Sequence, residues 1–104
     1  MTRGEIYRVK LPVSRDHEQR GPGYGVIVQA DALLRLSTVL VAPTSRSAAP
    51  ATFRPEVEID GRPTRVLVEQ LRAVDVQRLE SFAGRLSTSE QRAVNDTLEV
   101  VLGL

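Results

Sequence analysis

With 104 residues, the chain has room for one domain around one hydrophobic core. It has no cysteine and a single histidine, which excludes a disulfide framework and cysteine or histidine metal clusters and fits a reducing compartment. No apolar run approaches the ~20 residues of a membrane span, and the net charge of +1 argues against a generic electrostatic coat for nucleic acid. We therefore expect a soluble, cytoplasmic protein without membrane partners.

Three segments in the first half of the chain have strand character. Glu5–Leu11 alternates between apolar and polar residues, with Arg8 and Lys10 on its polar face. Gly25–Ala30 and Thr38–Ala42 are nearly continuous β-branched and aliphatic runs, which are typical of strands covered on both faces. Residues 12–24 are predicted to form a long polar loop, and residues 31–37 a helical turn or an irregular connection.

The second half begins with a loop over Thr44–Phe53 and continues with a hairpin. Glu56–Ile59 alternates cleanly, and Asp60-Gly61 is a typical two-residue hairpin turn leading into a strand over Thr64–Glu69. A shorter helical turn is expected around Asp75–Ser81.

The end of the chain has the pattern of an amphipathic helix. Ser87 and Glu90 form the sequence signature of a capping box. Val94, Leu98, Val101 and Leu102 follow at helical spacing, and Gly103 is well placed to end the helix. The sequence therefore predicts a mostly β protein with helices (α+β), in which antiparallel strands close into a small, partly open barrel with a C-terminal helix.

A candidate phosphate site lies directly after the run that ends at Ala42. Thr44 and Ser45 offer two hydroxyls there, next to the guanidinium of Arg46. Hydroxyls and arginine are suitable donors to phosphate oxygens. Thr-Ser pairs in loops also commonly bond their own backbone, so the pair has a structural explanation as well.

Several segments, taken in order, resemble the MazF/PemK family of toxin endoribonucleases of type II toxin–antitoxin systems. They are residues 4–11 (GEIYRVKL), 25–31 (GVIVQAD), 38–46 (TVLVAPTSR), 68–75 (VEQLRAVD) and 84–87 (GRLS). The resemblance spans nearly the whole chain and implies one domain over residues 1–104, an SH3-like barrel that acts as a homodimer. It further implies a sequence-specific, ribosome-independent enzyme that needs no metal or other cofactor. Such enzymes cleave single-stranded RNA through its 2′-hydroxyl, leaving 2′,3′-cyclic phosphate and 5′-hydroxyl ends, and are neutralised by a cognate antitoxin protein.

The resemblance also indicates catalytic residues. Thr44 and Ser45 match the hydroxyl position that follows the third strand of the family. The arginine of the family's Arg-Pro step before the second strand is missing, because Gly23-Tyr24 stands there. Arg20, three residues earlier, is the candidate substitute, with charge stabilisation as its role because a guanidinium does not act as a base near neutral pH.

Seven residues are candidate RNA contacts. Glu18, Gln19 and Gln70 are candidates by the same resemblance, Tyr24 because its ring could stack on a base, and Arg46, Arg54 and Arg72 because they lie in or beside loops and strand ends. Each has a structural alternative. Tyr24 fits an aromatic at the end of the barrel, Gln70 fits a residue that satisfies backbone groups, and some arginines fit partners of nearby glutamates. His17 is either an acid–base group or a solvated loop side chain.

Two other functions remain open on the same scaffold. One is a toxin that, like CcdB, binds DNA gyrase instead of cutting RNA. The other is a catalytically weakened module that binds RNA or titrates an antitoxin. The missing Arg-Pro step is what keeps these alternatives open.

Overall fold

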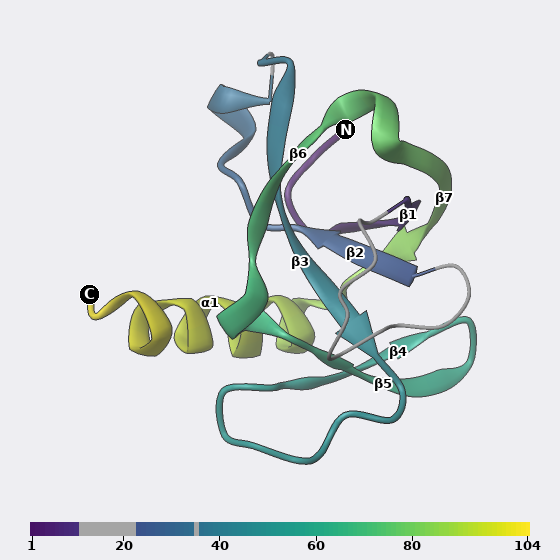
Figure 1. Cartoon of the computed structure of the whole chain (residues 1–104). Helices are drawn as coiled ribbons and strands as arrows, with labels where there is room; N and C mark the ends of the chain where they lie inside the picture. Colours follow the sequence, from purple (N-terminus) through teal and green to yellow (C-terminus); the bar gives the residue numbers. More distant parts are fainter. Residues whose placement is uncertain (11–22, 35) are drawn as a thin grey trace.

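The computed structural model describes residues 1–10, 23–34 and 36–104. Within these ranges the chain forms a β-sheet, three short 3-10 turns and one α-helix (Figure 1). The strands are β1 (Glu5–Val9), β2 (Gly23–Ile27), β3 (Thr38–Ser45), β4 (Glu56–Ile59), β5 (Arg62–Val66), β6 (Arg72–Asp75) and β7 (Leu79–Arg85). The turns are η1 (Asp31–Leu33), η2 (Val68–Gln70) and η3 (Val76–Arg78), and the helix is α1 (Thr88–Leu102). The predictions for Leu11, His17, Glu18, Gln19 and Arg20 lie outside the described residues.

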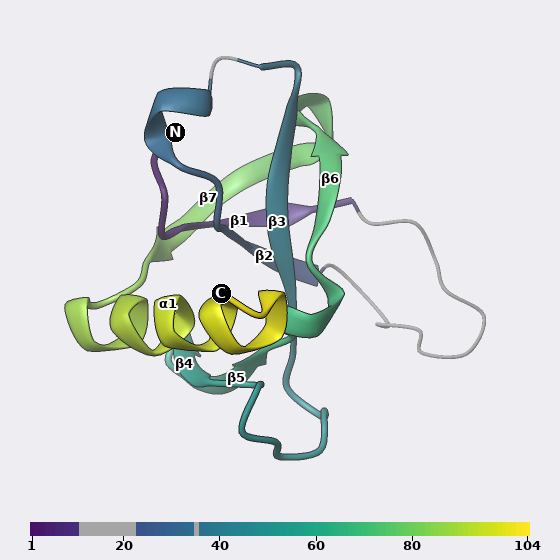
Figure 2. The ribbon, with the colours of Figure 1, turned by 90° about the vertical axis from the view of Figure 1, so that its left-hand side faces the viewer.

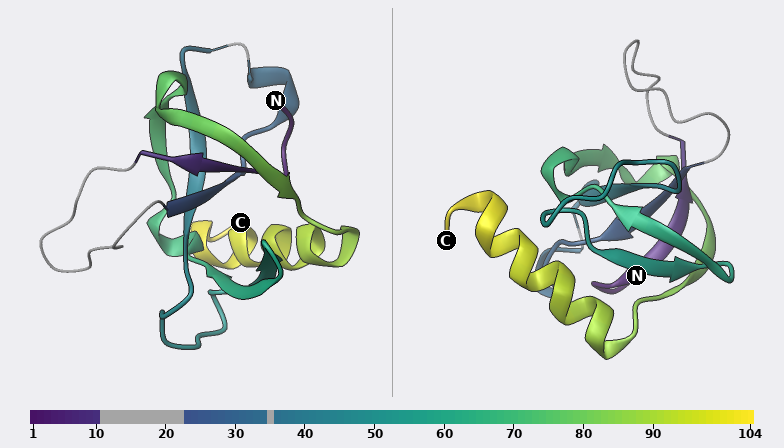
Figure 3. Two further views of the ribbon diagram at one scale, coloured as in Figure 1. Left: turned by 90° about the vertical axis from the view of Figure 1, so that its right-hand side faces the viewer. Right: turned by 90° about the horizontal axis from the view of Figure 1, so that it is seen from below.

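The sheet is antiparallel and strongly curled. Its strand order is β4-β5-β3-β2-β1-β7, and β6 pairs with β3 off this path. Figure 2 shows α1 lying across one side of the curled sheet. Seen from below in Figure 3, α1 runs along one side of the sheet and its C-terminal end projects away from the strands. The predicted architecture, an antiparallel, partly open barrel with a C-terminal helix, is confirmed.

Strand β3 holds the two parts of the sheet together. Its first half, residues 38–41, pairs with β6, whereas Thr44 and Ser45 pair with Val66 and Arg65 of β5. Pro43 lies between these two pairings, and its carbonyl accepts a hydrogen bond from the Leu67 amide at 2.8 Å. Proline has no backbone N–H to donate to a sheet ladder. It is tolerated at residue 43 because this residue lies between the stretches of β3 that pair with β6 and with β5.

The prediction that Thr44 and Ser45 begin a loop is wrong, because both are residues of β3. The sequence suggested a strand end at Ala42 because Pro43 normally interrupts a central strand. The structure instead continues the strand past the proline with a new partner. This correction changes the direction in which the two hydroxyls point.

Other boundaries differ from the predictions by a few residues. β2 begins at Gly23 and ends at Ile27, and β5 runs over Arg62–Val66 because residues 68–70 form η2. The helical turn expected around Asp75–Ser81 is confined to η3. Strands β6 and β7 were not predicted at all.

Both faces of the central strands are covered, as their continuous apolar runs predicted. Val26 and Ala42 belong to the core cluster that packs against Val94 and Leu98 of α1. Their neighbours in sequence, Ile27 and Val41, point the other way and belong to a second cluster with Val9, Val39 and Val74. The alternation within each strand divides one run between two cores.

The terminal helix begins and ends where the sequence predicted. The Ser87 hydroxyl accepts from the Glu90 amide at 3.1 Å, and the Glu90 carboxylate accepts from the Ser87 amide at 2.8 Å, which completes the capping box. Gly103 adopts a left-handed conformation, with φ of 72°, and ends the helix. Asp60 and Gly61 both have positive φ, so the predicted hairpin turn at these residues has the signature of type I′.

Candidate functional site

The side chain of Thr44 joins β3 to the start of β2. Its hydroxyl donates a hydrogen bond to the Tyr24 carbonyl at 2.8 Å, and the residue is only 4% exposed. Thr44 therefore has a structural role, but it joins two strands and does not make the local backbone bond that the sequence left open for it. Its predicted contact with a phosphate stays a prediction. To donate a hydrogen bond to a phosphate oxygen, the Thr44 hydroxyl would have to break its hydrogen bond to the Tyr24 carbonyl.

Ser45 points to the opposite face of the strand from Thr44, because successive side chains in a strand alternate. Its Oγ accepts from the Ser47 amide at 3.3 Å in a local turn. The structure thus separates the two hydroxyls that the sequence placed in one site. One phosphate on one face of the sheet can meet only one of them directly.

Tyr24 lies between two other side chains on the face that carries α1. In β1–β2 pairing it stands opposite Arg8, and the hydrogen bond from Thr44 places that residue on its other side. Tyr24 itself is half-buried and packs against the α1-side core, which fits the prediction of a barrel-end aromatic. Arg8, Tyr24 and Thr44 therefore form a row across three adjacent strands.

Arg54 is engaged in holding a loop in place. Its Nε and Nη2 lie 2.9 and 2.8 Å from one carboxylate oxygen of Glu69, and its Nη1 donates to the Ala49 carbonyl at 3.1 Å. The guanidinium also lies over the Phe53 ring, 5.5 Å from its centroid. These contacts tie the segment after β3 to η2, so Arg54 is one of the arginines that pair with a nearby glutamate. Its RNA-binding role stays a prediction.

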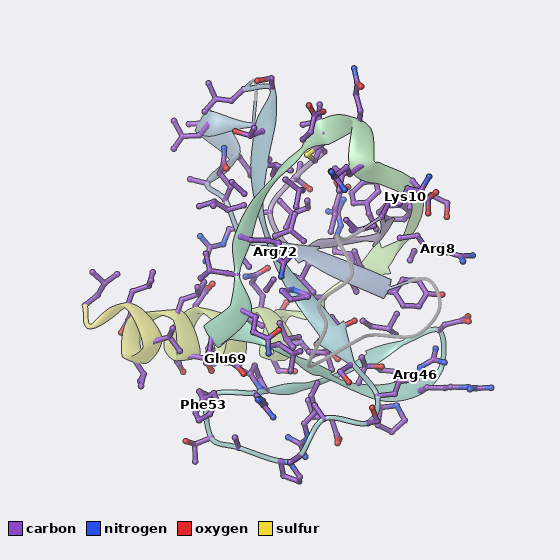
Figure 4. All side chains as sticks on the ribbon, viewed as in Figure 1. Arg8, Lys10, Arg46, Phe53, Glu69 and Arg72 are labelled. Atoms are coloured by element: carbon purple, nitrogen blue, oxygen red, sulfur yellow. The ribbon has the colours of Figure 1, made fainter. Side chains whose placement is uncertain are left out.

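The other described candidates divide between two places. Arg46 is exposed directly after β3, whereas Arg72 is half-buried in β6 opposite Val41. Gln70 is half-buried in η2, where its backbone amide donates to the Leu67 carbonyl. In Figure 4, Arg46 lies on the right-hand side of the molecule, Arg72 lies near its centre, and Glu69 and Phe53 lie lower on the left.

Three cationic residues that the sequence analysis left out of the site come to the same side as Arg46. Arg8 lies in β1 and Lys10 directly follows that strand, and both lie on the right-hand side in Figure 4. Lys10 is joined to Arg78 of η3, since the Lys10 amide donates to the Arg78 carbonyl at 3.0 Å and Arg78 Nη1 donates back at 3.2 Å. The alternating pattern of residues 5–11 placed Arg8 and Lys10 on one face of a strand, but no local pattern in the sequence linked that face to β2 or β3.

At the start of β1, the pKa of the Glu5 carboxyl group is lower than its usual value. Burial acts to raise that pKa, but hydrogen bonds from the Thr2 amide and the Tyr7 hydroxyl, with the charges of the N-terminus and Arg85, lower it overall. Burial and the contact with Glu5 raise the pKa of Tyr7. This cluster fastens the first residues to β7 and is separate from the candidate site.

The described part of the chain contains no group of three or more histidine, cysteine, aspartate or glutamate side chains that could hold a metal ion. None of its helices is long and apolar enough to cross a membrane.

The curled antiparallel sheet and its C-terminal helix define a small half-barrel protein, with Arg8 opposite Tyr24 and Arg46 directly after β3. The model of PemK-like, MazF-like toxins of type II toxin–antitoxin systems matches residues 2–102. The chain belongs to this family, which confirms the resemblance drawn from the sequence.

Relatives and solved structures agree with this placement. The chain is 47% identical over 75 residues to a candidate toxin of Mycobacterium tuberculosis, covering 71% of this chain and 70% of that protein. It is 32% identical over 111 residues to endoribonuclease MazF of Staphylococcus saprophyticus, covering 100% of this chain and 92% of that protein. A mycobacterial endoribonuclease solved with its cognate antitoxin has a TM-score of 0.84 at 18% identity, covering 100% of this chain and 96% of that chain. MazF from Deinococcus radiodurans has a TM-score of 0.81 at 19% identity, with 100% and 97% covered. At these identities the likeness to solved structures shows the fold.

Proposed function

We propose that this toxin is a sequence-specific, ribosome-independent endoribonuclease that cleaves single-stranded RNA without a metal ion. The observation that carries the proposal is its 32% identity, over its whole length, to a protein named endoribonuclease MazF. A gyrase-binding function is the second candidate, because the family that matches the chain is the PemK-like, MazF-like one. The protein is expected to act in the cytoplasm, where its substrate is found.

The proposed reaction uses the substrate's own nucleophile. The 2′-oxygen of the ribose attacks the adjacent phosphorus and loses its proton, the bond from phosphorus to the 5′-oxygen breaks, and that oxygen gains a proton. The products are a 2′,3′-cyclic phosphate and a 5′-hydroxyl. The protein's part is to hold the phosphate in line and to stabilise the negative charge of the phosphorane.

Arg20 and the hydroxyls of Thr44 and Ser45 are the residues proposed to act on the reacting phosphate. Because Thr44 and Ser45 point to opposite faces of β3, the buried Thr44 is best placed to act on the face that it shares with Tyr24. Ser45 is then the candidate for an adjoining phosphate.

The remaining predicted residues serve to bind the RNA. Arg46 and Tyr24 would contact nucleotides at the ends of β2 and β3, and Gln70 and Arg72 would contact nucleotides near η2. Arg54 would contact the RNA either after releasing Glu69 or while still paired with it. Glu18 and Gln19, which lie between β1 and β2 in the sequence, complete the proposed set.

The proposal includes two protein partners. A second copy of the chain would form an RNA-binding groove together with this one, and an antitoxin would cover that groove. The support for an antitoxin is the family membership and the mycobacterial neighbour that was solved with its cognate antitoxin.

The direct test is to incubate the purified, antitoxin-free protein with a long transcribed RNA in excess chelator and to map the cuts. We expect discrete cuts with cyclic-phosphate and 5′-hydroxyl ends. Intact RNA from protein shown to be folded would contradict the proposal. A supercoiling assay with DNA gyrase on the same sample then separates a gyrase-binding toxin from an RNA-binding module.

A further inference from the structure

Arg8 combines a buried donor with a charge that has no partner among the described residues. The residue is half-buried, and its Nε is buried without a hydrogen-bond partner in the described part of the chain. A buried donor left without an acceptor is unfavourable, because it has given up its hydrogen bonds to water without replacing them. A site with such a donor recovers this loss when a ligand brings an acceptor to it.

None of the ion pairs that arginines form in the described part of the chain includes Arg8. Glu5 lies 3.0 Å from Arg85, and Glu69 lies 2.8 Å from Arg54. The first pair joins the start of β1 to β7, and the second joins the segment after β3 to η2. Because no described carboxylate pairs with Arg8, an external anion can complement its charge, and phosphate is the anion that RNA supplies.

The strand register puts Arg8 where such a phosphate would be held. Val9 and Arg8 stand opposite Gly23 and Tyr24, the step at which the sequence lacks an arginine on β2. Residues paired across an antiparallel ladder have Cα atoms about 4.5–5.5 Å apart. The side chain of an arginine on β1 therefore reaches the space above its neighbour on β2.

Thr44 fixes the other side of this space. Its hydrogen bond to the Tyr24 carbonyl locks the ends of β2 and β3 together on the face that Arg8 shares with Tyr24. The planar guanidinium can donate two parallel hydrogen bonds to one phosphate group, which a lysine cannot.

We propose that Arg8 binds a backbone phosphate of the RNA at the ends of β2 and β3, and so supplies from β1 the cation that is absent from β2. The inference rests on the proposed function and deepens it, since it names a phosphate-binding residue that neither motif nor spacing marked. It also makes Arg20 unnecessary as the principal cation of the site.

The test compares four variants in binding and cleavage. Arg8→Met keeps the aliphatic stem and removes the charge, Arg8→Lys keeps the charge without the fork, Arg20→Met tests the alternative cation, and Arg92→Met on the exposed surface of α1 is the matched control. The cut position is first mapped with wild-type protein. The probe is then a short RNA carrying a 2′-deoxy residue at that position, so that binding is measured without cleavage.

We expect Arg8→Met to weaken binding about tenfold or more and to reduce the slope of log K against log salt by about 0.7, as for one lost contact to a single strand. Arg8→Lys should recover the salt slope but only part of the cleavage rate, and Arg92→Met should match the wild type. The melting temperature of Arg8→Met should not fall, because its Nε has no described partner to lose.

The outcomes separate this inference from the proposed function. If wild-type protein cuts and binds RNA and Arg8→Met does the same, Arg8 is not a phosphate ligand and the inference fails alone. A large drop in melting temperature with unchanged binding by the folded fraction also overturns it. If wild-type protein neither cuts nor binds RNA, both proposals fail.

Discussion

The carboxylate of Glu90 in α1 accepts a hydrogen bond from the backbone amide of Glu58 in β4, at 2.7 Å. Its other oxygen accepts from the Ser87 amide, so one side chain both caps the helix and occupies a donor of the edge strand. Burial acts to raise the pKa of Glu90, but these amides and the Ser87 hydroxyl lower it overall. One carboxylate thus links the terminal helix to the β4–β5 hairpin.

Replacing Glu90 with glutamine should destabilise the fold by about 1–2 kcal/mol, because the amide side chain has one oxygen where two amides need an acceptor. Denaturation in urea measures the change in the free energy of unfolding. Glu99→Gln, at an exposed position of the same helix, is the control and should stay within about 0.5 kcal/mol of the wild type. Equal effects of the two substitutions would contradict the proposed link.

Stability should fall in acid, and part of the loss should come from Glu90. A carboxyl whose folded-state pKa is lowered stabilises the fold fully above its usual value of 4.5, and this contribution is lost as the pH falls through the folded-state pKa. Glu5 acts in the same direction. Urea denaturation at pH 7 and at pH 3 should therefore show a smaller acid loss for Glu90→Gln than for wild type. An identical pH dependence would show that Glu90 does not titrate abnormally.

Thr44 offers a way to separate structure from catalysis. Thr44→Val has nearly the same shape but removes the hydrogen bond to Tyr24, so it should cost about 1–2 kcal/mol and reduce cleavage. Thr44→Ser keeps the hydroxyl and should retain most of the activity. Cleavage by the folded fraction of Thr44→Val at the wild-type rate would remove Thr44 from the list of catalytic residues.

Gly25 should not tolerate even alanine. A Cβ at this position would overlap a methyl group of Val41 and come within 2.9 Å of one from Val9, in the second core. Overpacking of this kind typically costs about 1–3 kcal/mol. Thermal unfolding of Gly25→Ala should show the loss, whereas Gly61→Ala tests a different cause, because that glycine has open space but a positive φ of 74°.

Arg46 and Arg72 are expected to bind RNA without contributing much to stability. Arg46→Met and Arg72→Met should each lower the salt slope of binding to single-stranded RNA by about 0.7. Arg54→Met should in addition lower the melting temperature, since it leaves Glu69 without its arginine. Filter binding at several salt concentrations, with thermal unfolding of the same samples, checks both expectations.

Local signals were sufficient for the elements that carry their own pattern. The capping box at Ser87 and the Asp60-Gly61 turn were predicted at their observed positions, because each depends on a few adjacent residues. Strands β6 and β7 have mostly exposed or half-buried side chains, so no hydrophobic alternation marks them. Their existence depends on pairing with β3 and β1, which only the fold supplies.

The candidate site was predicted in part for the same reason. The sequence placed Tyr24 before the second strand and Thr44 after the third, and the hydrogen bond between them shows that the two residues lie together in the fold. It could not show that Thr44 and Ser45 point apart, because that follows from β3 continuing past Pro43. The sequence also could not associate Arg8 with Tyr24 and Thr44, because strand register, and not spacing along the chain, brings these three residues together.

Pro43 has a consequence for folding fidelity. A one-residue slip of β5 that set Val66 opposite Pro43 would face that residue with a ring nitrogen that carries no hydrogen, and would turn every buried side chain of β5 to the wrong face. Pro43 therefore acts on the alignment of β5, whereas β6 ends its pairing opposite Val41 and would not reach the proline after such a slip.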